Sequence, residues 1–161
     1  MITEYTAELF VHAIAIEREA AARYAELAAT MARLGNHAVA ALFGMLAIFE
    51  GRHLEELQRR TAGLRLPPLE ADYSWRGAEA PETVRLDPHA GPITQQKALA
   101  LALEAEKRAR AFFEHAARLC KDAETRQLAH EMALEEAEHV VLIERMIERG
   151  PREGDWRSAA H

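Results

Sequence analysis

Cysteine is almost absent from this sequence, and its absence excludes several kinds of metal and redox site. Cys120 is the only cysteine among 161 residues, so the chain has no internal disulfide bond, no thiolate zinc or iron–sulfur site and no four-cysteine iron centre. Any metal ion must therefore be held by Glu, Asp and His side chains. Oxygen and imidazole ligands suit iron, manganese or zinc.

Aromatic and β-branched residues are also scarce. Aromatic residues make up 6 % of the chain and hydrophobic residues as a whole 49 %, while Ala, Leu, Glu and Arg dominate. This composition is typical of helical proteins, and at this length it allows one well-buried core. The composition therefore predicts a single all-α domain.

The sequence lacks both a surplus of positive charge and a long uncharged segment. Its formal net charge is −6, and the arginines are interspersed with glutamates, so we expect no nucleic-acid partner. The first residues lack the basic region of a secretory signal, and no uncharged run approaches the roughly 18 residues that a membrane span requires. We expect a soluble cytoplasmic protein with no membrane partner.

Proline is absent from four long stretches that carry apolar residues at helical spacing. These stretches predict helices at residues 3–33, 37–61, 94–120 and 123–149. Each helix would be roughly 37 to 46 Å long, and only a bundle buries helices of that length. Very short turns join the first two helices and the last two. The sequence therefore predicts a four-helix bundle made of two antiparallel hairpins.

Five of the six prolines lie between the two hairpins, in residues 63–93. This segment has no helical period, and its 31 residues are enough to cross the length of a bundle. We expect a long crossover connection within a bundle domain of residues 1–150, followed by a tail of residues 151–161. The side chains expected to hold the crossover against the bundle are Leu66, Tyr73 and Trp75.

Two acidic residues interrupt the apolar faces of the first and third expected helices. Read in steps of seven residues, the apolar stripe of the first helix contains Glu17, and that of the third contains Glu106. The nearby Glu104 belongs instead to a stripe with Lys97 and Arg118, which is typical of a solvated face. We therefore expect Glu106, and not Glu104, to face the core.

The second and fourth expected helices each carry a Glu-x-x-His pair on the apolar stripe. The pairs are Glu50 with His53 and Glu136 with His139. Adding 86 residues converts the first pair into the second, and adding 89 converts Glu17 into Glu106, so the two halves repeat. In each hairpin the acidic residues of the two helices are about equally far from the turn. The four acidic residues are therefore expected at one level of the bundle.

Four carboxylates at one buried level need a compensating positive charge, because an isolated buried carboxylate is costly. Two divalent cations supply it. We expect each ion to have one terminal glutamate and one histidine, with two bridging glutamates and open coordination positions. Glu17 and Glu106 are the expected terminal ligands, and Glu50 and Glu136 are the expected bridges.

Each of these elements alone has a simpler interpretation. A single glutamate on an apolar face usually reaches solvent or forms an ion pair between helices, and a single Glu-x-x-His is common in helices rich in glutamate. The metal interpretation therefore depends on the coincidence of four such elements in register.

The sequence also predicts the environments of several residues outside the expected ligand set. For Tyr24 we favour a core aromatic over a hydrogen-bond donor or radical relay at the metal site. Glu135 and Glu138 flank the fourth-helix pair, and one of them is a candidate hydrogen-bond partner for a ligand. Cys120 is expected to be a small core residue. The histidines expected at the surface are His12, His37, His115 and His130.

Four motifs carry a resemblance to a known family. They are AIEREAAARYAELA in the first expected helix, FEGRHLEEL in the second, EAEKRARAFFEHAA in the third and EEAEHVVLIERM in the fourth. Together they resemble the rubrerythrin branch of the ferritin-like superfamily. The resemblance covers all four helices, but not the crossover or the tail. It implies a ferritin-like bundle, a di-iron centre that reacts with hydrogen peroxide or dioxygen, and a homodimer.

Two departures from the family pattern bear on function. Rubrerythrins proper carry a rubredoxin domain that delivers electrons, and this chain has no cysteines for one, so its electron donor must be another protein or a small molecule. Many members also have an extra carboxylate one turn after the third-helix ligand, where this chain has Ala109. The remaining four Glu and two His are similar to the bacterioferritin centre.

We therefore expect a di-iron oxidoreductase that binds and reduces peroxide or dioxygen with electrons from an external donor. One alternative is a ferroxidase that oxidises ferrous ions for storage, and another is a non-catalytic metal-binding bundle. The uncharged run at residues 38–49 covers more faces of the second helix than one seam requires. We interpret it as a homodimer contact.

Overall fold

The computed structural model describes residues 2–69 and 93–149. These ranges hold four helices and no strand: α1 (Glu4–Arg33), α2 (His37–Thr61), α3 (Gln95–Leu119) and α4 (Ala123–Arg149). Each observed boundary lies within one residue of the predicted one, so the all-α prediction is confirmed. Most of the predicted crossover, with Tyr73 and Trp75, and the whole predicted tail lie outside the described residues.

Local interactions determine where the helices begin and end. The Thr94 hydroxyl accepts a hydrogen bond of 3.2 Å from the Lys97 backbone amide at the start of α3, and the Asp122 carboxylate accepts one of 2.8 Å from the Thr125 amide in α4. Such caps satisfy amides that have no partner within the helix. Gly35 follows α1 with a φ of 79°, a left-handed conformation that glycine adopts without steric cost.

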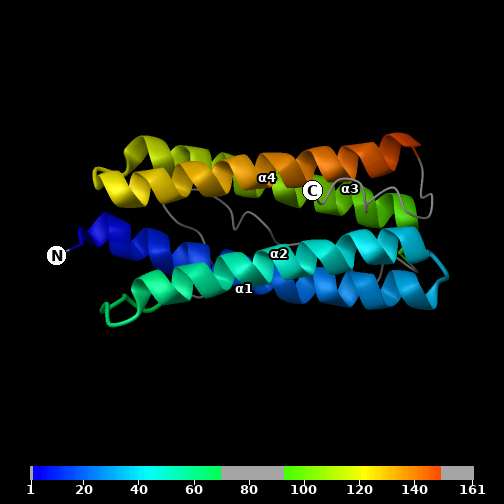
Figure 1. Cartoon of the computed structure of the whole chain (residues 1–161), viewed down its shortest axis with the longest axis horizontal. Helices are drawn as coiled ribbons and strands as arrows, with labels where there is room; N and C mark the ends of the chain where they lie inside the picture. The colour runs from blue at the N-terminus through cyan, green and yellow to red at the C-terminus, as the bar shows by residue number, and fades with distance from the viewer. Residues whose placement is uncertain (1, 70–92, 150–161) are drawn as a thin grey trace.

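The four helices form a bundle of two antiparallel hairpins, as predicted (Figure 1). Helix α1 pairs with α2, and α3 pairs with α4. Figure 1 shows that α2 ends and α3 begins at opposite ends of the bundle. This arrangement is the one that a bundle with a long middle connection adopts. No helix within residues 2–69 and 93–149 is both long and apolar enough to cross a membrane.

Two hydrophobic clusters fill the interior of the bundle. One contains Leu27, Phe43, Leu99 and Ile143, and the other contains Phe10, Leu57, Phe113 and Met132. Along every helix the two clusters are separated by the positions at which the sequence places a buried Glu or His. The bundle therefore has a polar layer between two apolar ones, and these apolar layers keep bulk water from the charged side chains.

The predicted positions of two other side chains are confirmed. Leu66, at the beginning of the predicted crossover, packs against the cluster that contains Phe10. Cys120 is buried, with its sulfur 3.7 Å from the Thr6 hydroxyl oxygen, so it is a small core residue.

The prediction for one histidine is wrong. His12 is buried in α1, whereas His37, His115 and His130 are exposed as expected. Helix α1 contacts both α2 and α3, so its buried face is wider than one stripe at heptad spacing. The prediction from heptad spacing included only that single stripe, so it did not place His12 in the core.

Candidate metal centre

The polar layer brings together the six side chains that the sequence predicts as metal ligands. They come from all four helices: Glu17 on α1, Glu50 and His53 on α2, Glu106 on α3, and Glu136 and His139 on α4. The four carboxylates are completely buried, while Glu104 is exposed. The potential ligand atoms of the six side chains form two groups of four residues each. Within each group these atoms lie within 4.8 Å of one another.

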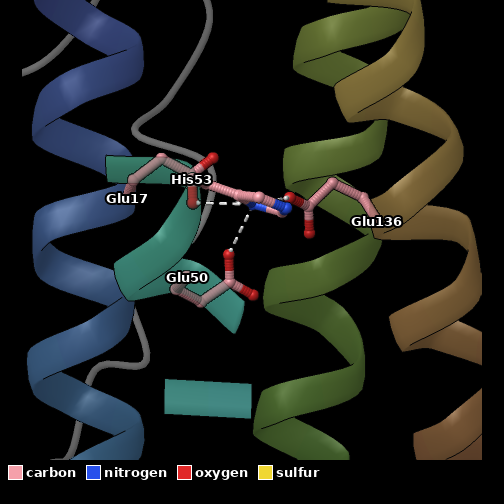
Figure 2. A group of neighbouring side chains, drawn as sticks. All are labelled: Glu17, Glu50, His53 and Glu136. Atoms are coloured by element: carbon pink, nitrogen blue, oxygen red, sulfur yellow. Dashed lines mark ion pairs between the residues drawn. The ribbon is translucent and has the colours of Figure 1, made fainter. Parts of the chain in front are cut away.

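The first group surrounds the Nδ1 atom of His53. Figure 2 shows Glu17 and Glu136 pointing toward this ring from opposite sides, with Glu50 below it. The His53 Nδ1 atom lies 3.4 Å from Glu17 Oε2, 3.2 Å from Glu50 Oε2 and 3.8 Å from Glu136 Oε1. Three carboxylate oxygens and one imidazole nitrogen thus converge on one small volume.

The second group surrounds the Nδ1 atom of His139 in the same way. This atom lies 3.0 Å from Glu50 Oε1, 3.4 Å from Glu106 Oε2 and 3.4 Å from Glu136 Oε2. The rings of His53 and His139 are nearly parallel, with an interplanar angle of 16° and centroids 5.9 Å apart. The twofold repeat of the sequence is therefore also a twofold repeat of the site.

Glu50 and Glu136 belong to both groups. Each of them directs one carboxylate oxygen toward His53 and the other toward His139. Glu17 and Glu106 belong to one group each. The geometry therefore fits the predicted roles, with Glu50 and Glu136 shared between two cations and Glu17 and Glu106 as terminal ligands.

The site fits a pair of divalent cations. Nine carboxylate and imidazole atoms of the six side chains are buried without a hydrogen-bond partner, and a buried polar group without a partner is costly. Metal ions would satisfy these atoms and neutralise the carboxylates. A donor set of four carboxylates and two imidazoles suits iron, manganese or zinc.

Burial and mutual repulsion make ionisation of the terminal carboxylates unfavourable without a metal. Burial raises the pKa of Glu17 well above its usual range, and the Glu50 charge raises it further. Burial likewise raises the pKa of Glu106, together with the charges of Glu136 and Glu50. Binding of divalent cations to these residues would therefore release protons.

The histidines lower the pKa of Glu50, the shared carboxylate of α2, and so favour its ionised form. Burial opposes ionisation of Glu50, but contacts with His139 and His53 outweigh it and lower the pKa of Glu50. Burial also opposes the charged form of His53, but Glu135, Glu17 and Glu50 raise the pKa of this imidazole. Burial likewise opposes the charged form of His139, but Glu106, Glu136 and Glu50 raise its pKa, so both imidazoles bind a proton more tightly than a free histidine does.

Tyr24 combines the two roles between which the sequence left a choice. It is a buried core aromatic, stacked on Phe43 with ring centroids 5.8 Å apart. Its hydroxyl also donates a hydrogen bond to Glu106 Oε1. Our preference for a core residue alone was therefore incomplete.

Two further side chains contact the histidines from outside the site. The Glu135 carboxylate contacts His53 Nε2, which is the partner role that the sequence left open between Glu135 and Glu138. Phe49 stacks on the His139 ring, with centroids 5.6 Å apart and an interplanar angle of 7°. Sequence reasoning missed Phe49, although it directly precedes Glu50 as Glu135 directly precedes Glu136.

A family model described as rubrerythrin matches residues 8–147, which include all six candidate ligands. The chain belongs to the rubrerythrin family. The chain is also similar to a solved structure, that of a protein described as an uncharacterized conserved protein from Magnetospirillum magnetotacticum MS-1. The sequence identity is 34 %, the TM-score is 0.77, and the match covers 92 % of this chain and 97 % of that one. No curated protein matches significantly.

Membership of the rubrerythrin family agrees with the fold and with the position of the polar layer. The predicted ferritin-like bundle is confirmed. The rubrerythrin model begins before α1 reaches Glu17 and ends after His139, so the family region contains the complete candidate site. The similarity therefore extends over all four helices that the site requires.

Proposed function

We propose that this rubrerythrin-family chain is a di-iron carboxylate protein that binds and reduces hydrogen peroxide or dioxygen. The observation that carries the proposal is the pair of four-residue groups that share Glu50 and Glu136. A structural ion is usually enclosed by one closed set of ligands. Two adjacent groups with shared carboxylates favour a pair of ions that act together on one small oxidant.

The roles of the residues follow from their positions. Glu17 and His53 would hold one ion, and Glu106 and His139 would hold the other. The shared carboxylates of Glu50 and Glu136 would bind both ions. A bound ferrous pair would supply the redox chemistry, with one electron from each ion for an oxidant that takes two. The protein holds the ligands at fixed positions, and the apolar clusters on either side of the site exclude bulk water.

A surface groove between α2 and α4 provides a route for a small oxidant. Its lining includes both histidines of the site, together with Phe49, Glu135 and Arg52. The groove therefore joins solvent to the outer side of the candidate centre. This route supports a reaction with a small diffusing molecule.

The electrons must come from outside this sequence. Cys120 is the only cysteine, so the sequence contains no rubredoxin domain, and we propose an external protein or small-molecule donor. We also propose a homodimer with a contact at the uncharged run of residues 38–49, in which Ile48 has 57 % of its surface exposed. The rest of that run is largely part of the core.

A ferroxidase function is the second candidate, and one position favours it. Ala109 is completely buried at the position where many rubrerythrins carry a further carboxylate, so the donor set is similar to that of bacterioferritin. A ferroxidase that stores its own product requires a closed shell of subunits. Size-exclusion chromatography separates the candidates, because a dimer contradicts a self-made shell and a 24-mer contradicts the simple peroxidase.

The direct test is an anaerobic reaction of the ferrous-loaded protein with hydrogen peroxide. We expect one peroxide consumed for every two ferrous ions oxidised, with two protons taken up and two water molecules formed. The control is the double variant Glu50→Ala with Glu136→Ala, which should show no rapid oxidation. If the parent protein keeps its metal but does not consume peroxide or dioxygen, the bundle is a non-catalytic metal-binding protein.

A further inference from the structure

The twofold repeat of the ligands does not extend to the side chains that contact them. Adding 86 residues converts Glu50 into Glu136, but the same shift converts Phe49 into Glu135. The two histidines therefore have equivalent ligands and different outer neighbours. His53 has a carboxylate at its outer nitrogen, whereas His139 has an aromatic ring against its face.

The contact between Glu135 and His53 defines which nitrogen of this imidazole can bind a cation. A neutral imidazole carries one proton, and a carboxylate at Nε2 favours the tautomer with that proton on Nε2. The lone pair is then on Nδ1, the atom that faces Glu17 and Glu50. A carboxylate bound to the second nitrogen also increases the basicity of a histidine ligand.

The ring of His139 is positioned by a different interaction. Phe49 lies parallel to it, and a stacked phenyl ring restricts the orientation of an imidazole but accepts no hydrogen bond in its plane. The His139 side chain is 6 % exposed and that of His53 13 %, while Glu135 is 50 % exposed. The His53 side of the site is therefore oriented by a residue at the protein surface.

We propose that Glu135 is a positioning residue that sets the affinity of the Glu17 and His53 subsite alone, so that the two metal subsites differ. This inference rests on the proposed two-metal site, but not on its activity. Loss of such a hydrogen-bond partner weakens metal binding about 10-fold to 100-fold. The subsite formed by Glu106 and His139 has no contact with Glu135 among the described ion pairs and should keep its affinity.

The experiment measures binding of cobalt(II), a redox-stable probe, to the full chain by equilibrium dialysis and by its visible absorption. The variants are Glu135→Leu, Glu135→Gln and the control Glu138→Leu, which changes another acidic residue of the same groove. Circular dichroism confirms that each variant is folded. The control variant should bind two ions, each with the affinity that it has in the parent protein.

Glu135→Leu should keep one affinity and lose about 10-fold to 100-fold in the other. Glu135→Gln should restore part of the loss, because its amide oxygen accepts the same hydrogen bond without the charge. In a His53→Ala background Glu135→Leu should have no further effect, while in a His139→Ala background it should retain its full effect. The comparison of these two backgrounds separates positioning of His53 from a general disturbance of the fold.

Two unchanged affinities in Glu135→Leu, or two affinities weakened equally, would overturn the inference while leaving the proposed function intact. Absence of cobalt binding by the parent protein would overturn both.

Discussion

The Tyr24 hydroxyl donates a hydrogen bond to the Glu106 carboxylate, across the bundle from α1 to α3. The two residues are 82 positions apart in the sequence. Shifting Tyr24 by the 89-residue repeat gives Phe113, which has no hydroxyl. This hydrogen bond therefore belongs to the second subsite only and adds to the inequivalence of the two halves.

Removal of this hydroxyl should destabilise the metal-free protein. Tyr24→Phe leaves the stacking ring in place but deprives a buried carboxylate oxygen of its donor, which costs about 1–3 kcal/mol of unfolding free energy. Urea denaturation of the metal-free parent and variant measures the difference. An unchanged unfolding free energy would show that the Glu106 carboxylate does not depend on Tyr24.

Replacement of one terminal carboxylate by a hydrocarbon should stabilise the metal-free protein while it removes a ligand. Glu17→Leu eliminates a buried carboxyl group without a hydrogen-bond partner, and burial of a polar group without a partner costs about 1–3 kcal/mol. Urea denaturation at neutral pH checks the gain. A metal-free variant clearly less stable than the parent would contradict the expected cost of burying Glu17.

The gain from Glu17→Leu should depend on pH. The pKa of Glu17 is raised in the folded protein, mainly by burial, so the folded state binds the proton more tightly than the unfolded state does. The parent protein therefore loses stability as pH rises above the usual range of a glutamate. The advantage of the variant should be larger at neutral pH than near pH 4, and an advantage that grows as pH falls would contradict this sign.

Addition of metal should raise the thermal stability of the parent protein. Ligands that bind only the folded state stabilise it by about 2.7 kcal/mol at a concentration 100 times the dissociation constant. For a chain of this size that corresponds to an increase in Tm of roughly 5 to 11 °C. Calorimetry with and without ferrous ions under anaerobic conditions measures the shift. Equal Tm values would show that the polar layer binds no cation.

The helices and the polar layer could be predicted from the sequence because both follow from periodicity. The spacing of Glu50 and His53 places both side chains on one face of a helix, and short turns place that face opposite Glu17. A single glutamate on an apolar face has simpler explanations, but four buried carboxylates at one level need a compensating positive charge, and this requirement limits the chemistry strongly.

The contacts around the ligands could not be predicted in the same way. Whether Glu135 or Glu138 reaches His53 depends on how α4 is rotated against α2, and helix periodicity does not determine this rotation. The burial of His12 depends on how many neighbours α1 has. Both features belong to the packing between helices, which involves residues far apart in the sequence.

Metal content is the most direct test of the proposed site. The protein is purified from iron-supplemented cells beside the double variant Glu50→Ala with Glu136→Ala, and metal is determined by elemental analysis. Because these two carboxylates belong to both groups, we predict close to two ions per chain in the parent and almost none in the variant. A folded parent protein without bound metal, or a variant that retains both ions, would contradict the dinuclear centre.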